Sequence, residues 1–288
     1  MGTKLTSNSK RFKATLYLPL CITLGMITFV ALEVFLLHVQ EQETILDWFR
    51  AGHLLLMSFL LLNTFGNVVK FLRTNPSIKG VLLTDCSVGQ GWDFCYSCEI
   101  HVPPRCQHCY NCNVCILRRD HHCVLLGQCQ GHANYRYLMG FLIYCWAGLL
   151  YATLFNAENF TNILHEGVSI HSFLLLLMPW LMLVTGQISA STFVFAFVAD
   201  ICVVGLLFCS GFLALQTALL FRGATSKEWY CGQRCYDLGW RHNVREFLGT
   251  RWFLIWLSPW IASPLPGDGI HFETRSPPVQ QLLKTPEL

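Results

Sequence analysis

The sequence is poor in charged residues. Only 13% of its 288 residues are Asp, Glu, Lys or Arg, against about 25% in soluble domains, and 53% are hydrophobic. Lys and Arg are absent between Arg136 and Arg222, a gap that the surface of a soluble protein would hardly tolerate. The net charge of +3 is small and does not suggest nucleic acid as a partner. These absences predict a membrane protein.

Hydrophobic runs long enough to cross a bilayer occur four times. They lie at about residues 15–39, 51–72 and 137–155 and within 193–221. Each must be helical, because lipid offers the backbone no hydrogen-bond partner. We therefore expect an all-α polytopic membrane protein with four transmembrane helices. The apolar run at 173–184 is short and contains Pro179, and we interpret it as a re-entrant or interfacial piece rather than a fifth span.

The charges that flank the spans set the orientation. Four bases and no acid precede the first span, and the loop at 70–136 and the tail from 222 are also basic. The other two loops carry acids at positions 41, 43 and 47 and at positions 158 and 166. Under the positive-inside rule both termini and the 70–136 loop are cytosolic, which requires an even number of spans.

The 70–136 loop contains a dense cluster of potential metal ligands. Eight cysteines and four histidines lie between Cys95 and Cys129, and His132 follows. Disulfides are disfavoured in the reducing cytosol, whereas CxxC pairs with an interposed histidine have the spacing of zinc sites. Two tetrahedral zinc ions need eight ligands. The cluster offers more than that, so at least one thiol is left for other chemistry.

The spacing favours an interleaved assignment, in which each CxxC pair takes its two remaining ligands from residues further along the chain. The first site would consist of Cys95, Cys98, His108 and Cys115, and the second of Cys109, Cys112, His122 and Cys129.

This assignment leaves Cys106 and Cys123 free. Cys123 directly follows a metal-binding His122, which fixes its backbone, and His121 and Asp120 are beside it. A fixed thiol next to a histidine, itself next to a carboxylate, is the arrangement that nucleophilic catalysis requires. The alternative of two all-cysteine sites would use Cys123 as a ligand.

The segment Asp120-His121-His122-Cys123, in a cysteine-rich loop between the second and third spans, resembles the DHHC family of protein S-acyltransferases, the palmitoyltransferases. Both zinc sites and the nucleophile of that family match the positions assigned above. The other elements that carry the resemblance are Pro103-Pro104-Arg105, Asn134-Tyr135-Arg136, Thr225-Ser226-Lys227-Glu228, and Tyr236-Asp237-Leu238-Gly239 with Asn243.

The resemblance implies a two-step acyl transfer with two structural zinc ions. Cys123 would take a fatty acyl group from palmitoyl-CoA and pass it to a cysteine of a protein substrate, with His121 as the base and Asp120 orienting it. The residues implied to support the active site are Thr225, Ser226, Glu228 and Asn243. The cations that could hold the CoA phosphates are Arg118, Arg119 and Lys227, although ordinary positive-inside charge also explains the two arginines.

The sequence departs from the family pattern at three places. Val124-Leu125 replaces the usual Pro-Trp after the nucleophile, Gln128 replaces an Asn, and Asn75-Pro76-Ser77 replaces Asp-Pro-Gly. The first departure keeps open a catalytically weak or inactive zinc-binding scaffold. A membrane-anchored RING-like ubiquitin ligase is another alternative, but residues 120–123 would have no purpose in it. A solute transporter is a third, disfavoured because the spans hold few charges.

The expected organisation has four parts. Residues 1–72 form a tail and two spans, 73–135 the cytosolic zinc domain, 136–222 two spans with a lumenal loop, and 223–288 a cytosolic tail. We expect a multi-pass protein of the Golgi or endoplasmic reticulum with a cytosolic active site. Its partners would be membrane lipid and proteins whose cytosolic cysteines lie near the membrane.

Overall fold

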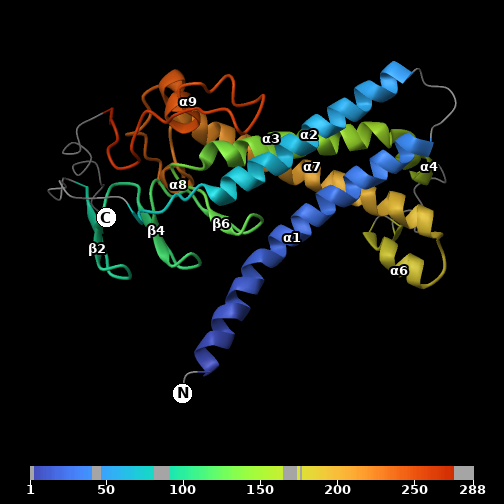
Figure 1. Ribbon diagram of the computed structural model, residues 1–288, viewed down its shortest axis with the longest axis horizontal. Coiled ribbons are helices and arrows are strands. Elements are labelled where there is room, and N and C mark those ends of the chain that lie inside the picture. Colours follow the sequence, from blue (N-terminus) through green and yellow to red (C-terminus); the bar gives the residue numbers. More distant parts are fainter. Residues whose placement is uncertain (1–2, 41–46, 81–90, 165–173, 176, 276–288) are drawn as a thin grey trace. The chain divides into compact units, whose positions relative to one another are not determined.

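Four long apolar helices dominate the computed structural model, which describes residues 3–40, 47–80, 91–164, 174–175 and 177–275 (Figure 1). They are α1 (Thr3–Gln40), α2 (Asp47–Arg73), α3 (Tyr135–Phe155) and α7 (Ala190–Arg222). The segments long and apolar enough to cross a membrane are Tyr17–Leu37, Trp48–Arg73, Tyr135–Phe155 and Ala190–Arg222. The four predicted runs overlap these segments, so the prediction of a four-helix, multi-pass membrane protein is confirmed.

In the described part of the apolar run at 173–184, residues 174, 175 and 177 are helical, and a separate short helix follows Met178. This is α6 (Pro179–Val184), six residues long and opened by Pro179. A span needs about 20 residues, so α6 cannot cross a bilayer. Residues 173 and 176 lie outside the described part, and the re-entrant placement stays a prediction. The remaining short helices are α4 (Ala157–Leu164), α8 (Ser226–Tyr230) and α9 (Trp240–Leu248).

The chain folds into two compact units. One consists of Cys21–Thr64 and Leu142–Leu213, and its core is an apolar cluster with side chains from α1, α3 and α7. One of the polar contacts there is the donation from Nδ2 of Asn156 to Oε2 of Glu33 over 3.0 Å. The other unit consists of Met1–Leu20, Phe65–Phe141 and Ala214–Leu288. All candidate site residues belong to this second unit.

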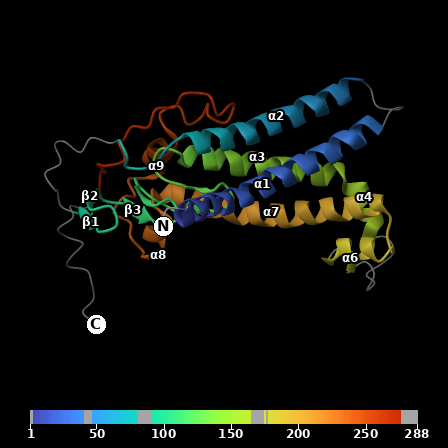
Figure 2. The ribbon, with the colours of Figure 1, turned by 60° about the horizontal axis from the view of Figure 1, so that its bottom comes forward.

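Three antiparallel hairpins fill the described chain between α2 and α3 (Figure 2). Their strands have only two or three residues, too few to be stable by pairing alone. This part of the fold therefore depends on the side chains that cross-link it. The paired strands are β1 (Asp93–Cys95) with β2 (Ile100–Val102), β3 (Gln107–Cys109) with β4 (Val114–Ile116), and β5 (His122–Cys123) with β6 (Gln128–Cys129).

The hairpins repeat with a constant period along the chain. The evenly spaced Cys95, Cys109 and Cys123 each end a first strand and pair with the residue five positions later. Each loop has the same length, and its last residue adopts the left-handed conformation. These residues are Glu99 (φ 55°), Asn113 (φ 50°) and Gly127 (φ 65°). The spacing of the ligands and the conformation of the backbone therefore repeat together.

Two asparagines join the hairpins to the helices. Asn75 follows α2, and its Oδ1 accepts from the backbone N–H of Ser77 over 3.0 Å, a turn in which Asn serves as well as Asp. Asn134 precedes α3 and donates from Nδ2 to the carbonyl of Cys129 over 2.9 Å. Its own side-chain oxygen accepts from Gly131 over 2.9 Å. The start of α3 thus fixes the strand that carries the last cysteine of the cluster.

Candidate active site and metal centres

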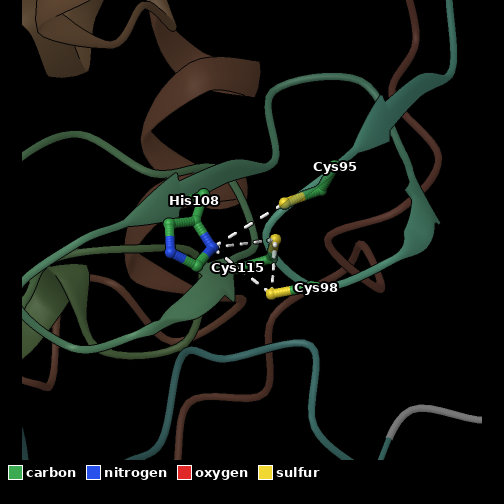
Figure 3. Close-up of side chains that lie close together, drawn as sticks. All are labelled: Cys95, Cys98, His108 and Cys115. Carbon is green, nitrogen blue, oxygen red and sulfur yellow. Dashed lines mark hydrogen bonds between the residues drawn. The ribbon is translucent and has the colours of Figure 1, made fainter.

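The ligand atoms of the first Cys/His set converge on one point (Figure 3). Nδ1 of His108 faces three sulfur atoms. They are those of Cys95 at 3.7 Å, Cys98 at 3.3 Å and Cys115 at 3.8 Å. The sulfur of Cys115 lies 3.6 Å from that of Cys98. The four residues that spacing grouped together are therefore together in space.

The second set has the same arrangement one hairpin further along the chain. Nδ1 of His122 faces the sulfur atoms of Cys109 at 3.7 Å, Cys112 at 3.4 Å and Cys129 at 3.6 Å. The sulfur of Cys112 lies 3.7 Å from that of Cys129. Cys109, Cys112 and Cys129 are supplied by the second and third hairpins, so this set links them.

These distances fit a tetrahedral zinc ion. With Zn–S bonds of about 2.3 Å and a Zn–N bond of about 2.0 Å, a tetrahedron places two sulfurs about 3.8 Å apart and a sulfur and a nitrogen about 3.5 Å apart. Three thiols and one imidazole form a donor set typical of structural zinc. Since the protein supplies all four positions, neither set has room for a substrate. The two clusters are consistent with zinc.

The catalytic candidates meet at the third hairpin. Nδ1 of His121 donates to Oδ2 of Asp120 over 2.8 Å, and the histidine side chain also hydrogen-bonds Cys123. Cys123 is buried on β5 and belongs to neither metal set. The structure therefore brings the three predicted residues into contact.

The electrostatics of this group favour a protonated His121 and an ionised Asp120. Burial opposes the charged form of His121, but its hydrogen bonds with Asp120 and Cys123 outweigh burial and raise its pKa to about 9. Burial likewise opposes the charge of Asp120, yet the hydrogen bonds it accepts, above all from His121, hold its pKa below the usual value. A protonated histidine beside a cysteine stabilises the thiolate, which is the nucleophilic form.

Asp120 is held by the start of α8. The backbone N–H of Ser226 donates to Oδ1 over 2.5 Å, and Oγ of Ser226 donates to Oδ2 over 3.1 Å. Because Ser226 is the first residue of α8, the carboxylate lies at a helix N-terminus, where negative charge is favourable. Asp120 precedes α3 in the sequence, whereas α8 follows α7. The carboxylate is therefore oriented by a segment that is distant in the sequence.

Two buried glutamines complete the surroundings of Asp120. Gln216 of α7 donates from Nε2 to Oδ2 of Asp120 over 3.2 Å, and its Oε1 accepts from Gln130 over 3.2 Å. Both glutamines are 0% exposed. The sequence analysis missed them. The available signal was a lone amide in the otherwise apolar end of α7, since a polar group in a span is costly and needs a partner.

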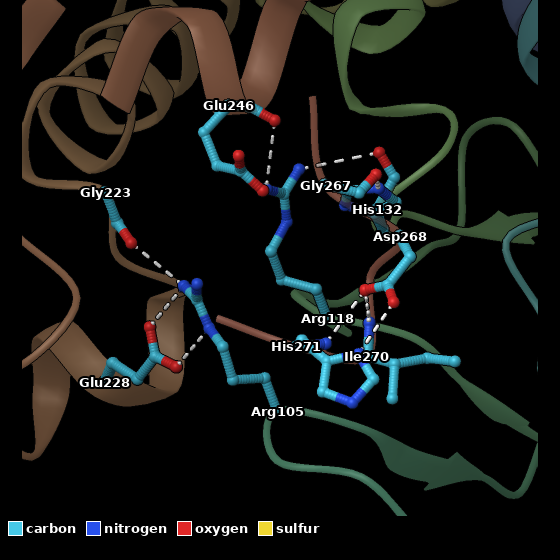
Figure 4. A network of polar contacts seen from close by, with 10 residues as sticks. All are labelled: Arg105, Arg118, His132, Gly223, Glu228, Glu246, Gly267, Asp268, Ile270 and His271. Carbon is cyan, nitrogen blue, oxygen red and sulfur yellow. Dashed lines mark hydrogen bonds and ion pairs between the residues drawn. The ribbon is translucent and has the colours of Figure 1, made fainter. Parts of the chain in front are cut away.

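Thr225 and Glu228 fix the start of α8 through a capping box. Oγ1 of Thr225 accepts from the N–H of Glu228 over 3.4 Å, and the N–H of Thr225 donates to Oε2 of Glu228 over 2.8 Å. Arg105 binds both carboxylate oxygens of Glu228 at 2.8 Å and donates to the carbonyl of Gly223 over 2.9 Å (Figure 4). This buried ion pair holds α8 against the hairpin region.

Comparison with known proteins agrees with this geometry. Residues 89–233 match the family model of the DHHC palmitoyltransferase. The chain belongs to the DHHC palmitoyltransferase family. It is 51% identical over 264 residues to the Probable palmitoyltransferase ZDHHC24 of Danio rerio, covering 89% of this chain and 90% of that protein. It is 50% identical over 225 residues to the Probable palmitoyltransferase ZDHHC24 of Homo sapiens, covering 78% and 79%. The Palmitoyltransferase ZDHHC22 of Mus musculus is 31% identical over 247 residues, covering 83% and 89%.

Family membership decides between the alternatives left open by the sequence. A DHHC palmitoyltransferase is a protein S-acyltransferase, so the chain is a membrane-bound enzyme of that class. The RING-like ubiquitin ligase and the solute transporter are thereby set aside. What remains is the part that each residue plays.

Asn243 fastens α9 to the end of α7. Its Nδ2 donates to the carbonyl of Phe221 over 2.8 Å and to Oδ1 of Asp237 over 3.0 Å. Its oxygen lies where a side chain at Gly223 would be, since a Cβ there would come within 2.7 Å of it. In this DHHC protein Asn243 therefore supports the turn that precedes α8, and its contacts lie away from Asp120.

The three candidate phosphate-binding cations have different surroundings. The Arg118 side chain is 1% exposed, stacks 3.8 Å over the ring of Phe247 and donates to the carbonyl of Glu246 over 3.3 Å (Figure 4). The half-buried Arg119 lies beside two thiols of the second metal set, those of Cys109 and Cys129. Lys227 is exposed on α8. The structure thus does not gather the three into one cationic site.

The second leftover thiol, Cys106, lacks the surroundings of a nucleophile. It is buried in an apolar cluster with Ile78, Val102, Leu117 and Ile270. Burial raises its pKa to about 12, and nearby thiols of the first metal set act in the same direction. A thiol of this kind is inert. The structure therefore separates the two cysteines that the zinc assignment left over.

The departures from the DHHC pattern lie outside these contacts. Val124 is 61% exposed at the tip of the third hairpin, where its carbonyl accepts from Gly127 over 3.3 Å. Gln128 donates from its side chain to the carbonyl of Thr74 over 2.9 Å, which ties the hairpin to the residue after α2. The hydrogen bonds of His121 described above go to Asp120 and Cys123, and not to these positions.

Proposed function

We propose that this enzyme transfers a palmitoyl group from palmitoyl-CoA to cysteines of proteins through a thioester on Cys123. The observation that carries the proposal is the chain of hydrogen bonds from Asp120 through His121 to Cys123. Among the described cysteines of the hairpin region, Cys123 is excluded from both metal sets and touches a histidine. Cys106 meets only the first of these conditions.

The proposed reaction has two half reactions with one proton carrier. The thiolate of Cys123 attacks the thioester carbon, the bond to the CoA sulfur breaks, and that sulfur takes the proton from His121. The thiol of the protein substrate then gives its proton to His121 and attacks the acyl-Cys123. The Cys123 thiolate leaves, and the resting thiolate–imidazolium pair is restored. Asp120 holds the ring in one orientation throughout.

We propose that both Cys/His sets hold structural zinc. A bound zinc ion cross-links the hairpins and contributes directly to the free energy of folding. The second set draws His122 and Cys129 from the two strands of the third hairpin, so it fixes the backbone on either side of the Cys123 loop. Arg119, beside the thiolates of this set, offsets their negative charge.

We also propose where the substrates bind. CoA phosphates need a cation, and Lys227 is exposed on the helix whose first residue contacts Asp120. The enclosed contacts of Arg118 support a structural role for it instead. The positive-inside pattern supports a cytosolic active site on Golgi or endoplasmic reticulum membranes. Suitable substrates are proteins whose cytosolic cysteines lie close to the membrane.

Purified protein incubated with labelled palmitoyl-CoA tests the proposal. Wild type should gain a hydroxylamine-sensitive label, and Cys123→Ser should lose it while keeping two zinc ions per chain. His121→Ala should slow loading by about 10²–10⁴-fold, the effect of losing a general acid–base catalyst. Cys106→Ser, the matched control at the other leftover thiol, should still load.

Two results would refute the proposal. Loss of a zinc ion from Cys123→Ser would make its sulfur a ligand rather than a nucleophile. A wild-type protein that keeps two zinc ions but never takes up the acyl group would have the DHHC fold without its chemistry.

A further inference from the structure

The third hairpin has the backbone of a metal-binding hairpin. Its strands pair in the same register as those of the first two hairpins. Its loop has the same length and ends in the same left-handed conformation, here at Gly127. Cys123 therefore occupies the position of Cys95 and Cys109, which both belong to metal sets.

One side chain distinguishes this hairpin from the other two. In the first two hairpins a second cysteine, Cys98 or Cys112, stands at the third position after the first and completes the CxxC pair. In the third hairpin the third position after Cys123 is Leu126, whose apolar side chain is 0% exposed. The third hairpin thus keeps the backbone of the other two but has a leucine where they have a second cysteine ligand.

The more distant ligand positions are also lost, but they lie outside the hairpin. In each set a histidine and a third cysteine follow the CxxC pair at the same two separations, as His108 and Cys115 follow Cys95. At those separations from Cys123 stand Arg136 and Ile143, which are not zinc ligands. Leu126 is thus the one replaced ligand that would lie in the same hairpin as the nucleophile.

A thiolate at position 126 would change the chemistry of Cys123. The two sulfurs of a CxxC pair chelate one ion, and His121, which already contacts Cys123, could supply a third ligand. A sulfur bound to zinc shares with the metal the electron pair that it needs to attack a thioester. Because zinc must reach the two neighbouring sites, it also has access to this hairpin.

We infer that Leu126 is a specificity-determining residue, the apolar side chain that keeps Cys123 free of metal and available for acyl transfer. The importance of the inference rests on the proposed function, in which Cys123 is the nucleophile. The structural basis of the inference is the comparison of the three hairpins alone. Leu126 denies the metal a second thiolate and so prevents chelation.

Metal counts on the full-length protein, purified in detergent with its zinc, test this inference. Wild type and the control Leu126→Ala should carry two zinc ions per chain. Leu126→Cys should carry three, and its Cys123 should resist alkylation by iodoacetamide until mild chelation removes the third ion. The double variant Leu126→Cys with Cys123→Ser has the same substitution in the core but lacks the pair of thiols. Its zinc content should therefore return to two ions per chain.

Two results would overturn the inference. One is a Leu126→Cys protein that keeps two zinc ions and is alkylated at Cys123 as fast as Leu126→Ala. The other concerns the wild-type protein. If excess zinc slows the alkylation of its Cys123, Leu126 does not keep the metal away.

A folding defect would not leave the question open. If Leu126→Cys loses the first two zinc ions, Leu126→His replaces it, because imidazole binds zinc and is closer in size to leucine. The same count of three is expected, and a count of two overturns the inference. Acyl loading of wild type is measured separately, so a failure of the proposed function would show there and not in the metal count.

Discussion

Gln216 donates from Nε2 to Oδ2 of Asp120 across 3.2 Å and so connects α7 to the carboxylate that contacts His121. An ionised carboxylate only accepts hydrogen bonds, so the amide of Gln216 must turn its N–H groups toward Asp120 and its oxygen toward Gln130. Gln130 then has to donate to that oxygen, as it does over 3.2 Å. The charge on Asp120 therefore sets the orientation of both buried amides.

Replacing Gln216 by Leu should slow acyl loading without weakening the binding of palmitoyl-CoA. The change removes one hydrogen bond to a buried charge, worth about 1.5–3 kcal/mol, which is roughly a 10–100-fold effect on rate. We expect kcat of loading to fall while KM stays constant. Thr217→Val, at the next position of α7, is the matched control. A rise in KM of the same size would contradict a positioning role.

Replacing Glu228 by Gln should destabilise the protein and also impair loading. It breaks a buried ion pair whose side chains are 3% and 9% exposed, and leaves Arg105 uncompensated, at a cost of about 3–5 kcal/mol. It also weakens the capping box that places Ser226 against Asp120. Thermal unfolding should show a lower midpoint for Glu228→Gln than for Lys227→Gln, the exposed control on the same helix. Equal midpoints would mean that the pair does not stabilise α8.

Folding stability should fall between pH 6.5 and pH 5 because of His132. Burial, together with the charge of Arg118, lowers the pKa of this histidine from 6.5 to about 3, and Nε2 donates to the carbonyl of Gly267 over 3.0 Å. Below pH 6.5 the unfolded chain binds a proton that the folded chain refuses. The stability is therefore complete above pH 6.5 and decreases as the pH drops.

The expected loss at pH 5 is roughly 2 kcal/mol, from about 1.4 kcal/mol for each pH unit. Unfolding midpoints measured at pH 7 and pH 5 should differ less in His132→Gln, which keeps a donor for Gly267 without the titration. A variant with an unchanged pH dependence would show that another group is responsible.

Restoring the usual residues of the family, Val124→Pro with Leu125→Trp, should change the rate of acyl loading by only about two- to threefold. Val124 is exposed and Leu125 is half-buried, and substitutions outside a packed core typically alter free energies by about 0.5 kcal/mol. Loading time courses of both proteins provide the measurement. A hundredfold gain in the substituted protein would instead identify the natural turn as the cause of a weak enzyme.

Most of what could be predicted depended on the spacing of residues close together in the sequence. The grouping of the ligands followed from CxxC pairs, because chelation by two thiolates fixes their separation in sequence. Most helix ends lie within four residues of the predicted runs, but α1 begins at Thr3, about twelve residues before its apolar stretch. The burial of Arg118 and the contact of Gln216 depend on how segments far apart in sequence pack, and periodicity contains no such information.

The repeat of the three hairpins is present in the sequence, but spacing alone did not predict it. Its signal is strongest in the two CxxC pairs and is interrupted in the third hairpin, where Leu126 takes the place of a cysteine. The left-handed residues at Glu99 and Asn113 also concealed it, because glycine marks this conformation only in the third loop.

The interleaving of the ligand sets has a consequence for biosynthesis. The first set is complete once the growing chain has reached Cys115, before Cys123 has been made. The second set closes only at Cys129, shortly after Cys123, and Asp120 must still await α8, which follows the last long helix. The ribosome therefore delivers the ligands of the first set first and the partners of Asp120 last, so that an unfinished chain lacks the hydrogen bonds from α8 that hold this carboxylate.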